Sequence, residues 1–292
     1  MPIYEQTYRE YSGDYRQRFR WVIIIQQELR ILIKSKLFLL MLLATLLHFL
    51  ARLMQITIYD VIAQQDPNSP FAMAFANIQD LEVNGAMMYD FMRIQSPLMF
   101  LVIIFSGAGM ICNDVKNNLM EIYFSKPITW VDYALGKILA LTLVAMAHTA
   151  VPAIILVLMH NLMLPGIDTI KESWWWLYAI LGFSAALILP CVLAVLASSA
   201  LIKSKNFASV AVFMLLIANS TMGATLGGVL VNPNYYATSF PMTVNRIGQH
   251  LFRDHRLLFQ LDWKWCVAYV FIVCVGALLI VLHRVRKAEI AQ

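Results

Sequence analysis

Six long apolar runs, separated by more polar segments, dominate this sequence. They cover residues 37–58, 94–112, 138–160, 174–201, 207–230 and 265–283. Each run is close to the roughly 20 residues that an α-helix needs to cross the hydrocarbon core of a bilayer. Because lipid offers no hydrogen bonds to the backbone, a span of this kind must be helical. We therefore predict an all-α, polytopic membrane protein with about six transmembrane helices.

The composition excludes a soluble globular enzyme. Only 13% of the 292 residues are charged and 60% are hydrophobic, whereas soluble domains carry about 25% charged residues. Four cysteines are scattered without a CxxC spacing, so neither a disulfide framework nor a metal site is indicated. They are Cys112, Cys191, Cys266 and Cys274. We predict no catalytic residue and no metal ligand in this chain.

The distribution of lysine and arginine predicts the orientation of the spans. Basic residues favour the cytoplasmic side of a membrane protein. They cluster in the short turn at Lys203 and Lys205 and in the tail that begins with Arg284. We therefore expect both termini in the cytoplasm. The net charge of +5 then reflects topology, and we expect no nucleic-acid partner.

The apolar runs divide the chain into three parts. Residues 1–36 are expected to form a cytoplasmic tail and an interfacial amphipathic helix, whose apolar face would hold Val22, Ile25, Leu29, Leu32 and Ile33 and whose polar face would hold Arg20, Gln27, Arg30 and Lys34. Residues 37–283 would form the six-helix domain, with outer segments at 59–93 and 231–264 and a cytoplasmic segment at 113–137. Residues 284–292 would form a basic cytoplasmic tail.

The cytoplasmic segment 113–137 is the most informative connection. Asn117 and Asn118 can start a short helix, and Pro127 would end it. Leu119, Met120, Ile122, Tyr123 and Phe124 would give that helix an exposed apolar surface. Thr129 and Asp132 bracket the start of the next helix. Such a surface favours a protein partner; the alternative is that the helix lies on the lipid surface.

Polar residues inside the spans are candidate functional residues. His48 and Arg52 lie four residues apart, so they could line a polar pathway or contact an anionic substrate. Alternatively, Arg52 reaches the outer interface, where Asp60 would assist it. His148 and His160 are too far apart to form one metal or haem site. Gly223 and Gly227 form a GxxxG motif, which predicts close helix packing.

A phosphate-binding loop is absent from the sequence. In the only Gly-Lys pair, Gly136-Lys137, the position five residues before the glycine is Val131, where that loop requires glycine. The chain therefore has no nucleotide site of this type.

The segment 113–137 resembles permeases of the type-two exporter kind of ABC transporter. Such permeases carry an acidic pair, Gly-Thr, Leu-x-Glu, Ser-x-Pro and a downstream Gly-Lys. The counterparts here are Asn113-Asp114, Asn117-Asn118, Leu119-Met120-Glu121, Ser125-Lys126-Pro127 and Gly136-Lys137. Gly-Thr is replaced by two asparagines, but asparagine tolerates the left-handed backbone, so the turn can be kept.

The resemblance implies a division of labour between subunits. A separate ATP-binding cassette ATPase would hold ATP and Mg, and this chain would bind no cofactor. A second permease chain would complete a homo- or heterodimer in the plasma membrane, which in a bacterium is the cytoplasmic (inner) membrane. The residues that couple to the ATPase would be Asp114, Leu119, Glu121, Ile122, Tyr123, Phe124 and Pro127, and membrane lipid would surround the spans.

Three other functions remain open from sequence. A secondary transporter would need inverted repeats and buried midplane charges, for which we find no convincing pattern. A membrane-embedded enzyme or haem protein would need clustered histidines or carboxylates at one depth. A non-transporting assembly or sensory protein is compatible with the same spans.

Overall fold

The computed structural model describes residues 19–64, 70, 73, 82–126, 128–164, 166–230, 233–254 and 261–290. The predicted tail at 1–17, much of the segment before residue 82 and Pro127 lie outside the described residues. The elements are α1 (Trp21–Ile33), α2 (Lys36–Ala63), α4 (Gly85–Gly107), α5 (Cys112–Lys116), α6 (Leu119–Phe124), α7 (Trp130–His148), α8 (Ala150–Met163), α9 (Ile167–Leu201), α10 (Lys205–Val229), the 3-10 helix η2 (Pro233–Thr238), α11 (Phe240–Leu251) and α12 (Trp263–Ile290).

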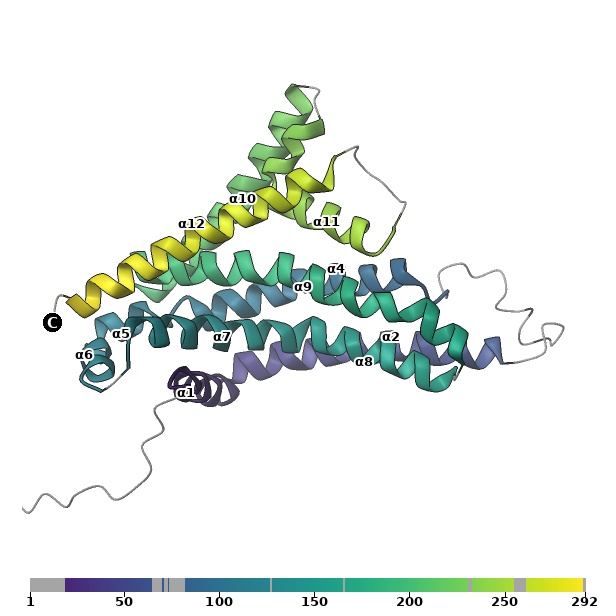
Figure 1. The fold of residues 1–292 in the computed structure, drawn as a ribbon, viewed down its shortest axis with the longest axis horizontal. Coiled ribbons are helices and arrows are strands. Elements are labelled where there is room, and N and C mark those ends of the chain that lie inside the picture. Colours follow the sequence, from purple (N-terminus) through teal and green to yellow (C-terminus); the bar gives the residue numbers. More distant parts are fainter. Residues whose placement is uncertain are drawn as a thin grey trace, which may run out of the picture.

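Six helical segments of the described chain are long and apolar enough to span a membrane. They confirm the all-α polytopic fold. Helices α2, α4, α7, α8 and α9 run side by side, while α10 and α12 spread away from them at one end (Figure 1). At the opposite end, α1, α5, α6 and the C-terminal end of α12 come together. That end is the one predicted to face the cytoplasm.

Helices α4 and α9 form the centre of the bundle. Two-thirds of their apolar windows (67%) are buried within the chain, against 17% in α2, α10 and α12. The latter three therefore expose most of their apolar surface, as expected of helices that face lipid or a second membrane subunit. The packed core includes Phe91, Met99, Phe183 and Val195, all almost fully buried.

The helices extend further than the apolar runs predicted. Helix α4 begins at Gly85 rather than at residue 94, capped by Asn84, whose side-chain oxygen accepts a hydrogen bond from the Met87 amide at 2.9 Å. In this first part Asp90 forms an ion pair with Arg93 at 3.2 Å. Residues 85–93 of the predicted outer segment 59–93 are therefore helical and continuous with the span, a feature that hydropathy alone does not register.

The third span is interrupted where α7 meets α8. Thr149 has φ −129° and ψ −72°, outside the helical region. Pro152 follows three residues later, and its lack of an N–H removes the hydrogen bond that the His148 carbonyl would otherwise accept. The imidazole Nδ1 of His148 lies 2.8 Å from the Val144 carbonyl. The proline therefore interrupts the span.

The segment 231–264 contains an amphipathic helix of its own. Helix α11 buries Thr243, Val244, Ile247 and Gly248. Gly248 lies against the rings of Tyr89 and Phe183, where an added Cβ would come within 2.4 and 2.7 Å of ring carbons. Helix α11 therefore covers the first part of α4 and the middle of α9 rather than forming a solvent loop.

Candidate functional site

A buried ionic cluster joins α1, α5 and α7 at the predicted cytoplasmic end. Lys137 of α7 is 1% exposed, and its Nζ lies 2.5 Å from Oε1 of Glu28 and 2.6 Å from Oδ2 of Asp114. The same Nζ donates to the Met110 carbonyl at 2.9 Å. The Tyr133 hydroxyl donates to Asp114 at 2.7 Å. We call Glu28, Asp114, Tyr133 and Lys137 the Lys137 cluster.

The cluster holds two carboxylates and one ammonium in a place largely closed to water. Its formal charge is −1 when both carboxylates are ionised. Charges that leave water are stable only when they are paired and hydrogen-bonded. Each carboxylate has the ammonium as its partner, and Asp114 gains a second donor in Tyr133. Separating α1 or α5 from α7 would therefore leave a buried charge without its partner.

The sequence places these side chains through local structure on each element. The turn between α4 and α5 is held by Ser199 of α9, whose hydroxyl oxygen accepts hydrogen bonds from the amides of Ile111 and Cys112, both at 3.1 Å. Asn118 adopts the left-handed conformation, with φ 53° and ψ 26°. Asn117, the counterpart of the glycine, has φ −98° and ψ 14°, so the left-handed position of this turn falls on the counterpart of the threonine.

Helix α7 starts with the predicted cap. The Thr129 hydroxyl oxygen accepts a hydrogen bond from the Asp132 amide at 3.2 Å, and the Asp132 carboxylate accepts one from the Thr129 amide at 3.2 Å. This reciprocal pair begins α7 at Trp130. One turn later, Tyr133 and Lys137 stand four residues apart on one face, so both reach Asp114.

A glycine lets α1 approach α7 closely. A Cβ at Gly136 would lie 2.7 Å from Cβ of Ile24. Ile24, Ile25, Glu28 and Leu32 are the buried residues of α1. Of the apolar face predicted for α1, Ile25 and Leu32 point into the bundle while Ile33 is exposed, and Glu28 lies on the buried side. The Gly-Lys pair thus serves two purposes, contact with Ile24 and pairing with Glu28.

The aromatic residues of α6 turn toward the same cluster. The rings of Tyr123 and Phe124 meet the ring of Tyr133 edge-on, at centroid distances of 5.4 and 6.1 Å. Lys137 Nζ lies 5.2 Å from the centroid of Tyr133. Burial raises the pKa of the Tyr123 hydroxyl, and the nearby carboxylates of Asp114 and Glu28 add to this rise while Lys137 opposes it. Tyr123 is therefore neutral at physiological pH.

The predicted coupling residues separate into two groups. Asp114 is buried, and Leu119, Tyr123 and Phe124 are half-buried. Glu121 and Ile122 are exposed, Ile122 by 56%. The predicted apolar surface is thus smaller than expected, because the rings of Tyr123 and Phe124 use Tyr133 of the same chain as their partner. Pro127, the remaining coupling residue, lies outside the described residues.

His48 and Arg52, the predicted pathway residues, make contacts within the chain. His48 Nδ1 lies 2.7 Å from Oε1 of Gln95, and its ring stacks on Phe91 at 4.8 Å. Arg52 donates to Gln55 at 2.6 Å. The expected help from Asp60 is wrong, because Asp60 is fully buried against His160, with Oδ1 2.9 Å from Nδ1.

The two glycines of the GxxxG motif contact the segment that follows α10. A Cβ at Gly223 would lie 2.5 Å from Cβ of Ser239, and one at Gly227 would lie 2.5 Å from the ring of Tyr236. The close packing that the motif predicts is present, and η2 with the start of α11 is the segment approached.

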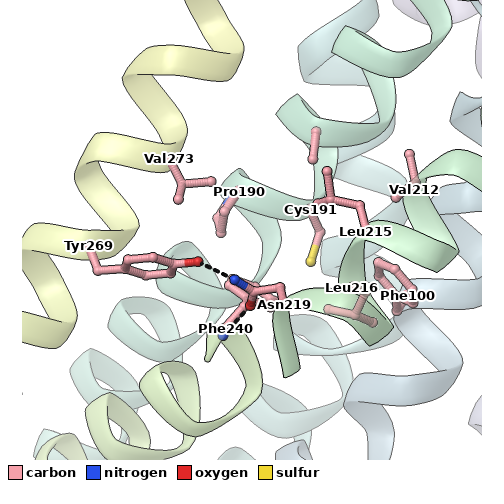
Figure 2. A pocket seen from close by; sticks show the side chains of 11 residues that line it. Phe100, Pro190, Cys191, Val212, Leu215, Leu216, Asn219, Phe240, Tyr269 and Val273 are labelled. Atoms are coloured by element: carbon pink, nitrogen blue, oxygen red, sulfur yellow. Dashed lines mark hydrogen bonds between the residues drawn. The ribbon is translucent and has the colours of Figure 1, made fainter. Parts of the chain in front are cut away.

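One turn earlier on α10, Asn219 holds three elements together (Figure 2). Its side-chain oxygen accepts a hydrogen bond from the Phe240 amide at 2.6 Å, and its Nδ2 lies 2.8 Å from the Thr238 carbonyl and 2.9 Å from the Tyr269 hydroxyl. Asn219 therefore binds the first amide of α11 and connects α10 to α12.

Among the described residues, no group of three or more His, Cys, Asp or Glu could hold a metal ion.

Sequence reasoning missed Glu28, Tyr133 and the pairing of Lys137. A signal existed for Glu28: it repeats with Ile24, Ile25 and Leu32 at helical spacing, so it falls on the face that α1 buries. Lys137 was noted only as part of a Gly-Lys pair. Its partners lie 109 and 23 positions away in sequence, which no local pattern reveals.

The comparison with known families covers most of this architecture. No curated protein matches the chain. The model of a family described as "ABC-2 family transporter protein" matches residues 22–252, which include α1, the Lys137 cluster, α6 and α11. The matched region is well over half of the 292 residues. The chain therefore belongs to the ABC-2 family of transporter proteins, as a membrane permease subunit.

Proposed function

We propose that this permease subunit works in an exporter driven by a separate ATPase that docks on α5 and α6. ATP and Mg would bind in that ATPase, and the permease would carry no cofactor. A second permease chain would complete the complex in the plasma membrane, with both termini on the ATPase side. The proposal rests on the family assignment and on the connection that the Lys137 cluster makes from α6 to the spans.

The Lys137 cluster is the observation that carries this proposal. A docked ATPase can move the spans only if the docking element is firmly connected to them. Helix α6 meets α7 through the Tyr133 ring, and α5 meets α7 and α1 through Asp114, Lys137 and Glu28. Because separating Asp114 or Glu28 from Lys137 breaks a buried ion pair, a displacement of α5 would carry α7 and α1 with it, while the aromatic contacts with Tyr133 keep α6 attached to α7.

The exposed residues of α5 and α6 define the surface on which the ATPase would dock. Along α5 and α6 the exposed apolar residues are Val115, 44% exposed, and Ile122, 56% exposed. Around them the exposed charged residues are Lys116, Glu121 and Lys126. An apolar centre with a charged rim is the usual composition of a protein interface. We therefore assign the ATPase contact to Val115 and Ile122, while Tyr123 and Phe124 hold α6 in place.

Co-purification from native membranes tests this assignment. Ile122→Asp should reduce the recovered ATPase by roughly thirtyfold, the effect of losing about 2 kcal/mol at an interface hot spot. Ile170→Asp is the matched control, because Ile170 is 54% exposed at the start of α9, far from α6. The isolated chain should hydrolyse no ATP. Equal recovery of the ATPase with both variants, or ATP hydrolysis by the pure chain, would contradict the proposal.

A further inference from the structure

An apolar groove runs between α9 and α12, with α11 as its third wall. It has a volume of about 550 Å³. Its floor contains Ala185 and Leu193 of α9, and its length follows α12 from Trp263 to Leu278. Apart from Cys274, His250 of α11 is the only ionisable one among the described residues that line the groove. The N-terminal part of α12 diverges from the bundle (Figure 1).

The groove lies at membrane depth. Both α9 and α12 are membrane-spanning helices, and Trp263 is the first residue of the α12 span. From Trp263 to Leu278 the helix rises about 22 Å, which exceeds the ~15 Å thickness of one hydrocarbon leaflet. Because α12 is inclined to α9, its projection along the membrane normal is shorter. The groove therefore extends over about one leaflet.

The dimensions of the groove select a narrow occupant. Measured out to the surfaces of its lining atoms, the groove holds about 1150 Å³ of empty space. Along about 22 Å this gives a cross-section of about 50 Å², which suits one or two hydrocarbon chains at their ~4 Å contact separation. A helix with its side chains is ~10 Å across, so the same length of helix would need roughly 1,700 Å³. A transmembrane helix of a second copy would thus need about one and a half times the empty space of the groove.

Polar groups gather at the end of the groove where α12 begins. The His250 ring stacks on the Trp263 indole at 4.3 Å, with 8° between their planes. Lys264, the next residue, is exposed. Tryptophan and lysine at the end of a span mark the level of the lipid headgroups. An apolar slot that ends at this level beside a cation matches the division of a phospholipid into chain and phosphate.

We propose that this groove binds one acyl chain of a phospholipid from the surrounding bilayer, with its phosphate beside Lys264 and His250. The bound lipid fills the space between the diverging α9 and α12. The proposal goes beyond the transport function, since it concerns a resident lipid rather than the exported substrate. It requires no ATPase and can therefore be tested on the permease alone.

Photolabelling of the permease in vesicles tests the site. The vesicles consist of phosphatidylethanolamine and phosphatidylglycerol, doped with a phospholipid that carries a diazirine in the middle of one chain. Label should concentrate in peptides covering 182–193 and 263–278. The reference is 39–50 of α2, whose apolar residues are mostly exposed and do not line this groove. We expect about tenfold more label in the groove peptides than in the α2 peptide, which corresponds to a tenfold higher affinity of the lipid for the groove.

Two variants separate a filled groove from general lipid contact. Ala185→Trp places an indole in the groove from an exposed position, and should reduce groove labelling to the level of α2. Ala268→Trp is the matched control, since Ala268 is exposed on α12 and does not line the groove; its labelling should stay unchanged. Lys264→Glu should weaken the labelling severalfold. Uniform labelling of the groove and α2, undiminished labelling in Ala185→Trp, or crosslinks between two permease chains at the groove would overturn the proposal.

Discussion

Replacing Lys137 by methionine should be far more damaging than replacing either of its carboxylate partners. Lys137→Met keeps the length of the side chain but leaves Glu28 and Asp114 without a cation. Because both oxygens lie within 2.6 Å of Nζ, they are within about 5 Å of each other. Two ionised carboxylates at that separation repel by about 3 kcal/mol at an effective dielectric constant of ~20. Removing one partner from a buried ion pair typically costs about 3–5 kcal/mol.

The double variant Lys137→Met, Glu28→Gln provides the decisive comparison. It removes one of the two repelling charges, so it should be more stable than Lys137→Met by about 3 kcal/mol. Glu28→Gln alone leaves Lys137 paired with Asp114 and should cost about 1 kcal/mol, the usual contribution of a hydrogen bond. This order of stabilities distinguishes an ionic cluster from apolar packing. If only packing mattered, adding Glu28→Gln to Lys137→Met would lower the stability further.

Thermal unfolding of the purified permease in detergent, followed by tryptophan fluorescence, measures these differences. One kcal/mol corresponds to roughly 2 °C in Tm for a chain of this size, so Lys137→Met should unfold several degrees below the original protein. Lys116→Met is the matched control, because Lys116 is exposed and should shift the Tm by less than about 1 °C. A Tm of Lys137→Met equal to that of Lys116→Met, or a further loss on adding Glu28→Gln, would refute the reasoning.

Three further predictions concern helix packing, the start of α11 and the orientation of the chain. Gly136→Ala should lower the Tm by several degrees, because the new Cβ would meet Ile24 and overpacking costs about 1–3 kcal/mol; Gly228→Ala, with nothing within 4 Å, should not lower it. Asn219→Leu should cost about 1–3 kcal/mol, since the first amide of α11 would lose its acceptor; a neutral result would mean that another group replaces it. Ser204→Cys, in a Cys-free background, should react with an impermeant maleimide only after the cells are opened; labelling of intact cells would reverse the predicted orientation.

The sequence alone determined the class of fold and several local features. Apolar runs of about 20 residues can only be helices in a bilayer, so the six spans followed directly. The cap formed by Thr129 and Asp132 was also readable, because it depends on residues within a few positions of each other. The resemblance in 113–137 likewise rested on local motifs, and the family match includes that segment.

Only the tertiary structure decided which faces meet. Glu28 and Lys137 are 109 positions apart. The local sequence around neither residue predicted that a polar residue of an interfacial helix would be buried in an ion pair. The direction of Tyr123 and Phe124 toward Tyr133 was equally hidden, as was the contact of Gly223 with Ser239. Lipid solvates every apolar face about equally well, so hydropathy places helices in the bilayer, and shape and polar pairing then choose their neighbours.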